Sequence, residues 1–191
     1  LKYSLMGWLP RDRADKDKIL EGERIIARQK NIIKEHPGAY IQNGMLLFLK
    51  GDFPGAKQEL ELAIKYTGGI DGAAHYSYAF IEFYQKRFKP GKEHLERAID
   101  LSADKLQLFN LDQIINFYHD ALETDSVPQL NYPLGIIYKK VKNDPNFAKK
   151  HLEAFIEWAK NNDNWAAPEK EKGKFINIAE NNLKDLKPVE V

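Results

Sequence analysis

The sequence predicts an all-α fold in which pairs of helices stack into a solenoid. One phrase, Lys-x-x-Leu-Glu-x-(Ala/Phe)-Ile, occurs three times, starting at Lys57, Lys92 and Lys149. Small residues recur with it, because Gly44 and Ala79 stand 35 positions apart. A period of this length is typical of helical repeats, in which each unit buries its apolar face against its neighbours.

The first element expected is an amphipathic helix over residues 12–35. Isoleucine occurs every seven residues, at Ile19, Ile26 and Ile33, and charged residues occupy the opposite face. Such an apolar stripe indicates a helix that packs on one side. Pro37 ends this helix, because the residue before a proline disfavours helical backbone.

The first helix pair is predicted at residues 38–67. Residues 39–50 are apolar around nearly the whole helical turn, so this helix is expected to be buried on both sides. Gly51 and Asp52 form the turn between the two helices. Pro54 then stands at the start of the second helix, where proline is tolerated.

The remaining elements follow from the same spacing. Ala98 and Phe155 stand 57 positions apart, which is one period of 35 plus 22 further residues, so an additional helix is expected between them. The sequence thus predicts, within a single domain of residues 1–191, a second pair at 72–102, an inserted helix at 106–124, a third pair at 130–161 with one extra residue in its Asn143-Asp144-Pro145 turn, and a charged capping helix at 168–187.

The recurring positions resemble the pattern of the tetratricopeptide repeat family. The resemblance is closest in the first unit, weaker in the second, where Lys86 and Arg87 replace Gly-Asp, and weakest in the third, where Phe155 replaces a small residue. It covers about half of the chain. The matching residues are Gly44, Gly51, Asp52, Phe53, Ala56, Leu60 and Ala63 in the first unit, Ala79, Phe88, Leu95 and Ala98 in the second, and Leu134, Gly135, Ala148 and Leu152 in the third.

The resemblance implies a right-handed superhelix whose concave groove, lined by the first helix of each pair, binds a peptide or a helix of a partner. Family members that grip a C-terminal carboxylate use Lys, Asn and Arg there, whereas most of these positions are apolar or aromatic in this chain, so carboxylate binding is not expected. The groove positions are expected to be Ile41, Met45, Phe48 and Leu49 in the first unit, Tyr76, Phe80, Phe83 and Tyr84 in the second, and Tyr132, Ile136, Lys139 and Lys140 in the third.

This groove has two alternative states. An open aromatic groove is typical of a partner site, because monomeric proteins rarely expose large apolar patches. Two amphipathic segments outside the pairs, residues 19–33 and 106–122, could instead lie in the groove and fill it. The partner site is then expected on the rim or in the part of the groove that stays open.

Composition argues against several other kinds of site. Lys plus Arg number 29 and Asp plus Glu 28, and the basic clusters at 11–13 and 170–174 are interrupted by acids, so no nucleic-acid partner is expected. Cysteine is absent, which excludes thiolate nucleophiles and Cys-type zinc sites. His94 and His151 share one repeat position and are interpreted as surface residues, as is the dipeptide at His119. The sequence therefore predicts no catalytic residue, no metal site and no cofactor.

The function predicted from these patterns is a non-enzymatic scaffold or adaptor that binds a protein or peptide. The alternatives are a self-associating subunit of a larger assembly, hence a homo-oligomer, and an accessory domain of a larger protein. Residues 1–10 are apolar but shorter than the roughly 20 residues of a spanning helix, so membrane insertion by this chain is not expected. A cytoplasmic location is the default expectation, and the alternatives are the bacterial periplasm and a membrane tether upstream of Leu1.

Overall fold

The computed structural model describes residues 16–32, 36–102, 111–162 and 169–186, which form helices and contain no strand. The all-α class predicted from the sequence is confirmed. In chain order the helices are α1 (Lys16–Ile32), α2 (Pro37–Leu49), α3 (Phe53–Tyr66), α4 (Gly72–Tyr84), α5 (Phe88–Ser102), α6 (Leu111–Thr124), the 3₁₀ turn η2 (Pro128–Leu130), α7 (Asn131–Ile137), the π-helical segment η3 (Tyr138–Lys142), α8 (Pro145–Asn161) and α9 (Glu169–Lys184).

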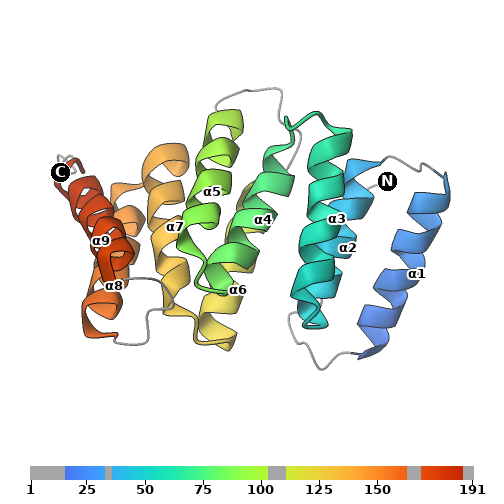
Figure 1. Cartoon of the computed structure of the whole chain (residues 1–191), viewed down its shortest axis with the longest axis horizontal. Coiled ribbons are helices and arrows are strands. Elements are labelled where there is room, and N and C mark those ends of the chain that lie inside the picture. The colour runs from blue at the N-terminus through green and yellow to red at the C-terminus, as the bar shows by residue number, and fades with distance from the viewer. Residues whose placement is uncertain (1–15, 33–35, 103–110, 163–168, 187–191) are drawn as a thin grey trace.

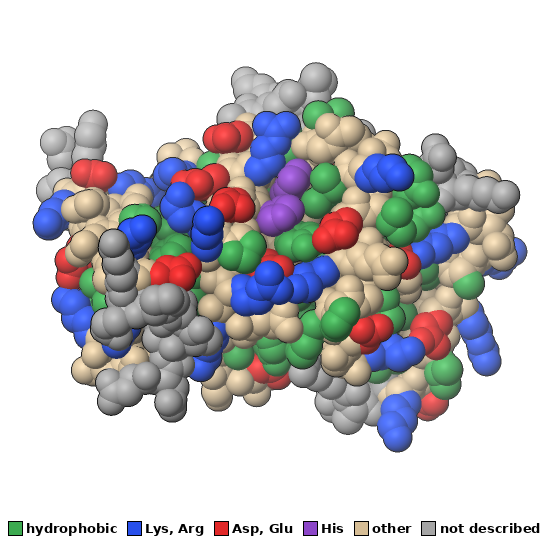
Figure 2. Space-filling model, in the orientation of Figure 1, with side chains coloured by type: hydrophobic (Ala, Val, Ile, Leu, Met, Phe, Trp, Pro, Cys, Tyr) green, Lys and Arg blue, Asp and Glu red, His purple; other side chains and the backbone are tan. Residues whose placement is uncertain are grey.

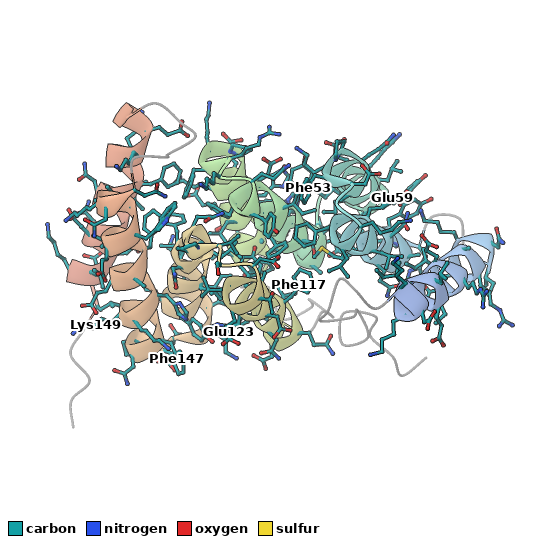
Figure 3. The ribbon with its side chains drawn as sticks, turned by 90° about the horizontal axis from the view of Figure 1, so that it is seen from below. Phe53, Glu59, Phe117, Glu123, Phe147 and Lys149 are labelled. Atoms are coloured by element: carbon teal, nitrogen blue, oxygen red, sulfur yellow. The ribbon has the colours of Figure 1, made fainter. Side chains whose placement is uncertain are left out.

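These helices lie side by side in one elongated stack, with α1 at one end and α9 at the other (Figure 1). The neighbours α2 and α3, α4 and α5, and α7 and α8 pack together as helical hairpins. Seen from below, α3 and α5 lie along one side of the stack and α6 lies on the opposite side (Figure 3). One hydrophobic core runs through the stack, from Ile26 in α1 to Ala179 in α9.

The helices that the structure describes can be compared with the segments expected from the sequence, and α2 begins at Pro37, one residue before the predicted pair at 38–67. α1 begins at Lys16 and ends at Ile32, inside the predicted 12–35, and residues 12–15 and 33–35 lie outside the described residues. The inserted helix is described from Leu111, so the first five residues of its prediction also lie outside that part of the chain. Both ends of the chain are likewise not described.

The turn after the first helix of each pair has the same backbone in all three units. Gly51, Lys86 and Asn143 all have positive φ angles, of 83°, 59° and 52°. The chain reverses at this left-handed residue in each hairpin. In the first two units the hydrogen bonds also correspond one to one, because Gly51 N donates to Phe48 O and Lys86 N donates to Phe83 O, each at 2.9 Å. This is the pattern of a Schellman motif, which satisfies carbonyl groups at the end of a helix.

The third unit carries its extra residue in the helix rather than in the turn, which corrects the prediction. Asn143 and the N-cap Asp144 match Gly51 and the N-cap Asp52 position for position. The additional residue is taken up by the π-helical segment η3, and Asp144 N donates to Tyr138 O at 3.0 Å. A π-bulge is the usual way in which an α-helix accommodates a single inserted residue.

Small residues set the distance between the helices of a pair. A Cβ atom added at Gly44 in α2 would lie 2.9 Å from Leu60 Cγ in α3. A Cβ atom added at Gly135 in α7 would lie only 2.6 Å from Leu152 Cγ in α8. The glycines therefore allow each leucine to pack against the backbone of the first helix, and they explain why the repeat pattern requires a small residue there.

Candidate functional site

Most of the predicted groove positions are core residues in this chain. Tyr76, Phe80 and Phe83 in α4 are fully buried, and so are Met45 and Phe48 in α2, with exposed fractions of 0–1%. Tyr84 is half-buried, Lys139 is partly buried and Lys140 is exposed. The aromatic surface is thus not an open groove. The other predicted positions that are buried are Ile41, Leu49, Tyr132 and Ile136.

Helix α6 covers the aromatic residues of α4. The rings of Phe117 and Tyr118 lie 4.8 Å and 5.0 Å from the ring of Phe80, both in edge-to-face geometry. Tyr118 is completely enclosed, and its hydroxyl donates to the backbone oxygen of Tyr76 at 2.8 Å. Burial raises the pKa of the Tyr118 hydroxyl well above its usual value, so it stays a donor. Figure 3 shows Phe117 on α6 at this junction.

The segment that follows α6 is also attached to α4, through Tyr84. The Tyr84 hydroxyl donates to Asp125 Oδ2 at 3.0 Å, and Gln129 Nε2 donates to the Tyr84 backbone oxygen at 2.9 Å. The Tyr84 ring packs edge-on against Phe48 at 4.8 Å. Tyr84 therefore lies at the rim where α2, α4 and the chain after α6 meet.

Helix α1 extends the stack and does not fill the groove. It lies beside α2 at one end of the molecule (Figure 1). Its Lys30 forms an ion pair with Glu59 of α3, and its Glu23 forms one with Lys50 after α2. Of the two segments that could have occupied the aromatic face, the inserted helix α6 occupies it.

In the third unit the predicted groove residues bind the C-terminal cap. The Tyr132 ring lies 5.1 Å from Phe155 in α8 and 5.2 Å from Phe175 in α9. Lys139 Nζ donates to Asn182 O at 2.9 Å and pairs with Asp185 at 3.3 Å. These contacts hold α9 against the third helix pair.

Two histidine pairs lie between the helices, and three of their members, His94, His119 and His151, are expected from the sequence to be surface residues. The first pair joins α4 and α5, with His75 Nδ1 and His94 Nδ1 2.9 Å apart. Tyr78 stacks on the His94 ring at 4.1 Å. A hydrogen bond between two Nδ1 atoms needs one N–H and one bare nitrogen, so this contact cannot form when both rings are fully protonated. Histidines are visible in the middle of the face shown in Figure 2, among acidic and basic side chains.

The second pair joins α6 to α8. The ring of His119 lies 5.1 Å from the ring of His151, which is only 3% exposed. Tyr138 contacts both, because its hydroxyl lies 3.0 Å from His119 Nε2 and its ring stacks on His151 at 5.5 Å. The shared repeat position of His94 and His151 was the signal in the sequence, since each pairs with a histidine from another helix. His151 is buried and His94 is partly buried, which corrects the surface interpretation.

Burial lowers the pKa of all four histidines below the usual value. Desolvation is the main cause in each case, and it lowers the pKa of His94 and of His151 to about 4. The pKa values of His75 and His119 are lowered by burial as well, with carboxylates nearby opposing the change. These rings are therefore neutral near neutral pH.

A buried carboxylate ties the first two helix pairs together. Glu82 in α4 is 1% exposed and lies 3.3 Å from Lys57 Nζ of α3 and 2.9 Å from Arg87 Nε after α4. Lys57 opens the repeated phrase of the first unit. Since a buried charge is tolerated only when it is paired, these two cations give Glu82 a structural role.

The described residues contain no group of three or more His, Asp or Glu side chains arranged to hold a metal ion. None of the described helices combines the length and apolar character that crossing a bilayer requires. Lys and Arg side chains alternate with Asp and Glu over the face in Figure 2, so this face carries no continuous basic footprint. Comparison with known proteins finds no matching family model, no matching curated protein and no matching solved structure.

Proposed function

We propose that this chain is a tetratricopeptide-like scaffold that binds an amphipathic helix of a partner protein on the face formed by α2 and α4. The observation that supports this proposal is the position of α6, an amphipathic helix that lies on the aromatic residues of α4. In the resembling family this face binds peptide segments. The chain thus carries, within itself, an occupant with the chemistry that such a face accepts.

The contacts of α6 describe the partner that would fit. Its buried side chains are Ile114, Ile115, Tyr118 and Ala121, at helical positions i, i+1, i+4 and i+7. The tyrosine reaches the backbone oxygen of Tyr76, and the half-buried Phe117 packs between Phe48 and Phe80. A partner helix of this kind would bring two aliphatic residues and one buried aromatic hydroxyl, and it would have to replace α6.

A synthetic peptide of residues 111–124 tests this proposal directly. The chain is compared with its Phe117→Ala variant, in which α6 loses ring contacts while its fully buried residues remain. We expect fluorescence anisotropy to show peptide binding to the variant and little or none to the unmodified chain. The control peptide carries Asp at the positions of Ile114 and Tyr118. A folded variant that binds neither peptide would contradict a helix-binding face.

Self-association is a second proposal, favoured by the apolar side chains exposed at the end of α3. Ile70 is 61% exposed and Tyr66 is 37% exposed. Contiguous exposed apolar surface is typical of contact surfaces, and these two side chains stand four positions apart in the chain. Light scattering over a concentration series, with Ile70→Ser as the comparison, should show a mass that rises with concentration only in the unmodified chain if this surface mediates association.

A further inference from the structure

We propose that His119, His151 and Tyr138 form a protonation-sensitive latch that holds α6 on the stack near neutral pH and releases it in mildly acidic solution. The latch is defined by these three residues. Its consequence for partner binding rests on the function proposed above, because release of α6 would uncover the face of α2 and α4.

The latch connects α6 to two other elements. His119 in α6 contacts Tyr138 of η3 through Nε2 at 3.0 Å, and its ring lies 5.1 Å from His151 of α8. The Tyr138 ring also stacks with His151 and with Phe147, at 5.5 Å and 5.0 Å between ring centroids. The second half of α6 is therefore held by polar and ring contacts rather than by aliphatic packing alone.

The hydrogen bonds of His151 fix which of its nitrogens carries the proton. Asn131 Nδ2 donates to Pro128 O at 3.0 Å, so the Asn131 oxygen faces His151 Nδ1 at 2.8 Å. Nδ1 of the neutral ring is thus the donor and Nε2 carries the lone pair. His151 Nε2 is buried and has no hydrogen-bond partner. Protonation would add an N–H group there with no acceptor, in a place that excludes water.

The charged groups around His119 and His151 do not remove the free-energy cost of protonating these rings. Asp120 and Glu123, both on α6, favour a charged His119, whereas Lys150 on α8 disfavours a charge on either ring. Each ring also disfavours a charge on the other, since the second proton would create two cations across one contact. Tyr138 and Asn131 are neutral groups. At His119 burial outweighs the two carboxylates, so its pKa is lowered. At His151 burial, followed by His119 and Lys150, lowers the pKa to about 4.

Release is expected at α6 because α8 is the more firmly held of the two helices. Leu152 and Phe155, which flank His151 on α8, are fully buried between α7 and α9. The His119 side of the contact belongs to a helix that covers only one face of the stack. A repulsion between the two rings is therefore relieved most easily by movement of α6.

Native-state hydrogen exchange of the α6 amides tests the latch, with the α2 amides in the same sample as the internal reference. If His151 regains a pKa near 6.5 on release, the release constant should rise about tenfold between about pH 7.5 and about pH 5.5 from this ring alone. We expect α6 protection to fall by at least this factor while α2 stays the more protected helix at both pH values. No change in α6, or α6 amides that exchange no faster than those of α2 at about pH 5.5, would overturn the proposal.

A double variant provides the matched control. This variant combines His119→Gln, whose amide nitrogen replaces Nε2 in the contact with Tyr138, and His151→Asn, whose amide nitrogen replaces Nδ1 in the contact with Asn131. Both contacts are therefore retained without a titratable group. Its α6 protection should not depend on pH, and a fall equal to that of the unmodified chain would overturn the latch. If the double variant does not fold, NMR titration of His151 in the unmodified chain decides instead, and an ordinary pKa near 6.5 would overturn the proposal.

Binding of the 111–124 peptide at the two pH values separates the two proposals. Release of α6 together with peptide binding at the lower pH supports both. Release without peptide binding supports the latch and contradicts the helix-binding face. Peptide binding that does not change with pH, together with unchanged α6 protection, contradicts the latch alone.

Discussion

The left-handed residue in the turn of each hairpin keeps its backbone while its side chain changes. Gly51 holds this position in the first unit, Lys86 in the second and Asn143 in the third. Glycine adopts a positive φ without penalty and asparagine tolerates it, whereas lysine pays a steric cost because its Cβ approaches the following carbonyl. The second hairpin is therefore built on a strained residue that the repeat geometry imposes.

Replacing Lys86 by glycine should stabilise the chain. Relief of the left-handed strain is worth about 1 kcal/mol after the entropy of the added glycine is deducted. The reverse change, Gly51→Ala, should lower the free energy of unfolding by a similar amount. Urea unfolding of both variants measures this, and a Lys86→Gly variant less stable than the original would show that the lysine side chain contributes contacts that outweigh the strain.

Gly135→Ala should destabilise the third hairpin. The new Cβ would lie 2.6 Å from Leu152 Cγ and 3.2 Å from the Leu152 backbone nitrogen, so the helices must move apart, at about 1–3 kcal/mol. Gly173→Ala in α9 is the control, because nothing lies within 4 Å of its added Cβ. The free energy of unfolding of this control should rise by up to about 1 kcal/mol, because alanine has a higher helix propensity than glycine. Equal effects at both sites would contradict close helix contact at Gly135.

Among the elements, α6 changes the role of α4 most. Without α6, Tyr76 and Phe80 of α4 would lose their contacts with Phe117 and Tyr118, whereas with it both belong to a closed core. The same residues thus contribute to stability in the present state of the chain. Their exposure in any partner-bound state depends on whether α6 moves.

Substitutions of Tyr84 test whether a predicted groove residue contributes to the stability of the chain. Tyr84→Ala removes a ring that packs against Phe48 and Phe80 and a hydroxyl that donates to Asp125, so we expect a loss of about 2–3 kcal/mol in stability. Tyr84→Phe removes the hydroxyl alone and should lose about 1 kcal/mol. Thermal unfolding of the two variants separates the contribution of the ring from that of the hydroxyl. An unchanged melting temperature for Tyr84→Ala would contradict the contacts of this ring with Phe48 and Phe80 and of its hydroxyl with Asp125.

At the scale of the whole molecule, the buried histidines make stability depend on pH. In the unfolded chain these rings have an ordinary pKa near 6.5, and in the fold their pKa is lowered, to about 4 for His94 and His151. Below pH 6.5 the unfolded state therefore binds more protons. The contribution of the pairs is complete above about pH 6.5 and is lost as the pH falls toward 4.

Denaturant unfolding between pH 7.5 and pH 4.5 should show this loss. The slope should correspond to an uptake of roughly one to two protons, less than four because the partly exposed rings are screened by solvent. The double variant His75→Gln, His151→Asn should make the free energy of unfolding less dependent on pH. A slope that persists in the double variant would assign the pH dependence to carboxylates.

The hairpins could be predicted because their information is local. Gly51, Pro54 and the run of apolar residues in α2 act over a few neighbouring positions, and the 35-residue period repeats them. The prediction that the extra residue of the third unit lies in the turn is wrong, because the sequence does not distinguish a longer turn from a π-bulge in the helix before it. Only hydrogen bonds, here from Asp144 N to Tyr138 O, distinguish them.

The sequence by itself determined the helical class, and it predicted helix pairs with small residues such as Gly44 at their crossings, since these features depend on propensity and spacing within one unit. The tertiary structure decided which of two amphipathic helices covers α4, and it brought His119 to His151 from different units. Apolar periodicity predicts that one face of a helix is buried, but it does not predict which segment covers that face. That choice depends on the shape and packing of distant segments, and here it turns the expected groove into core.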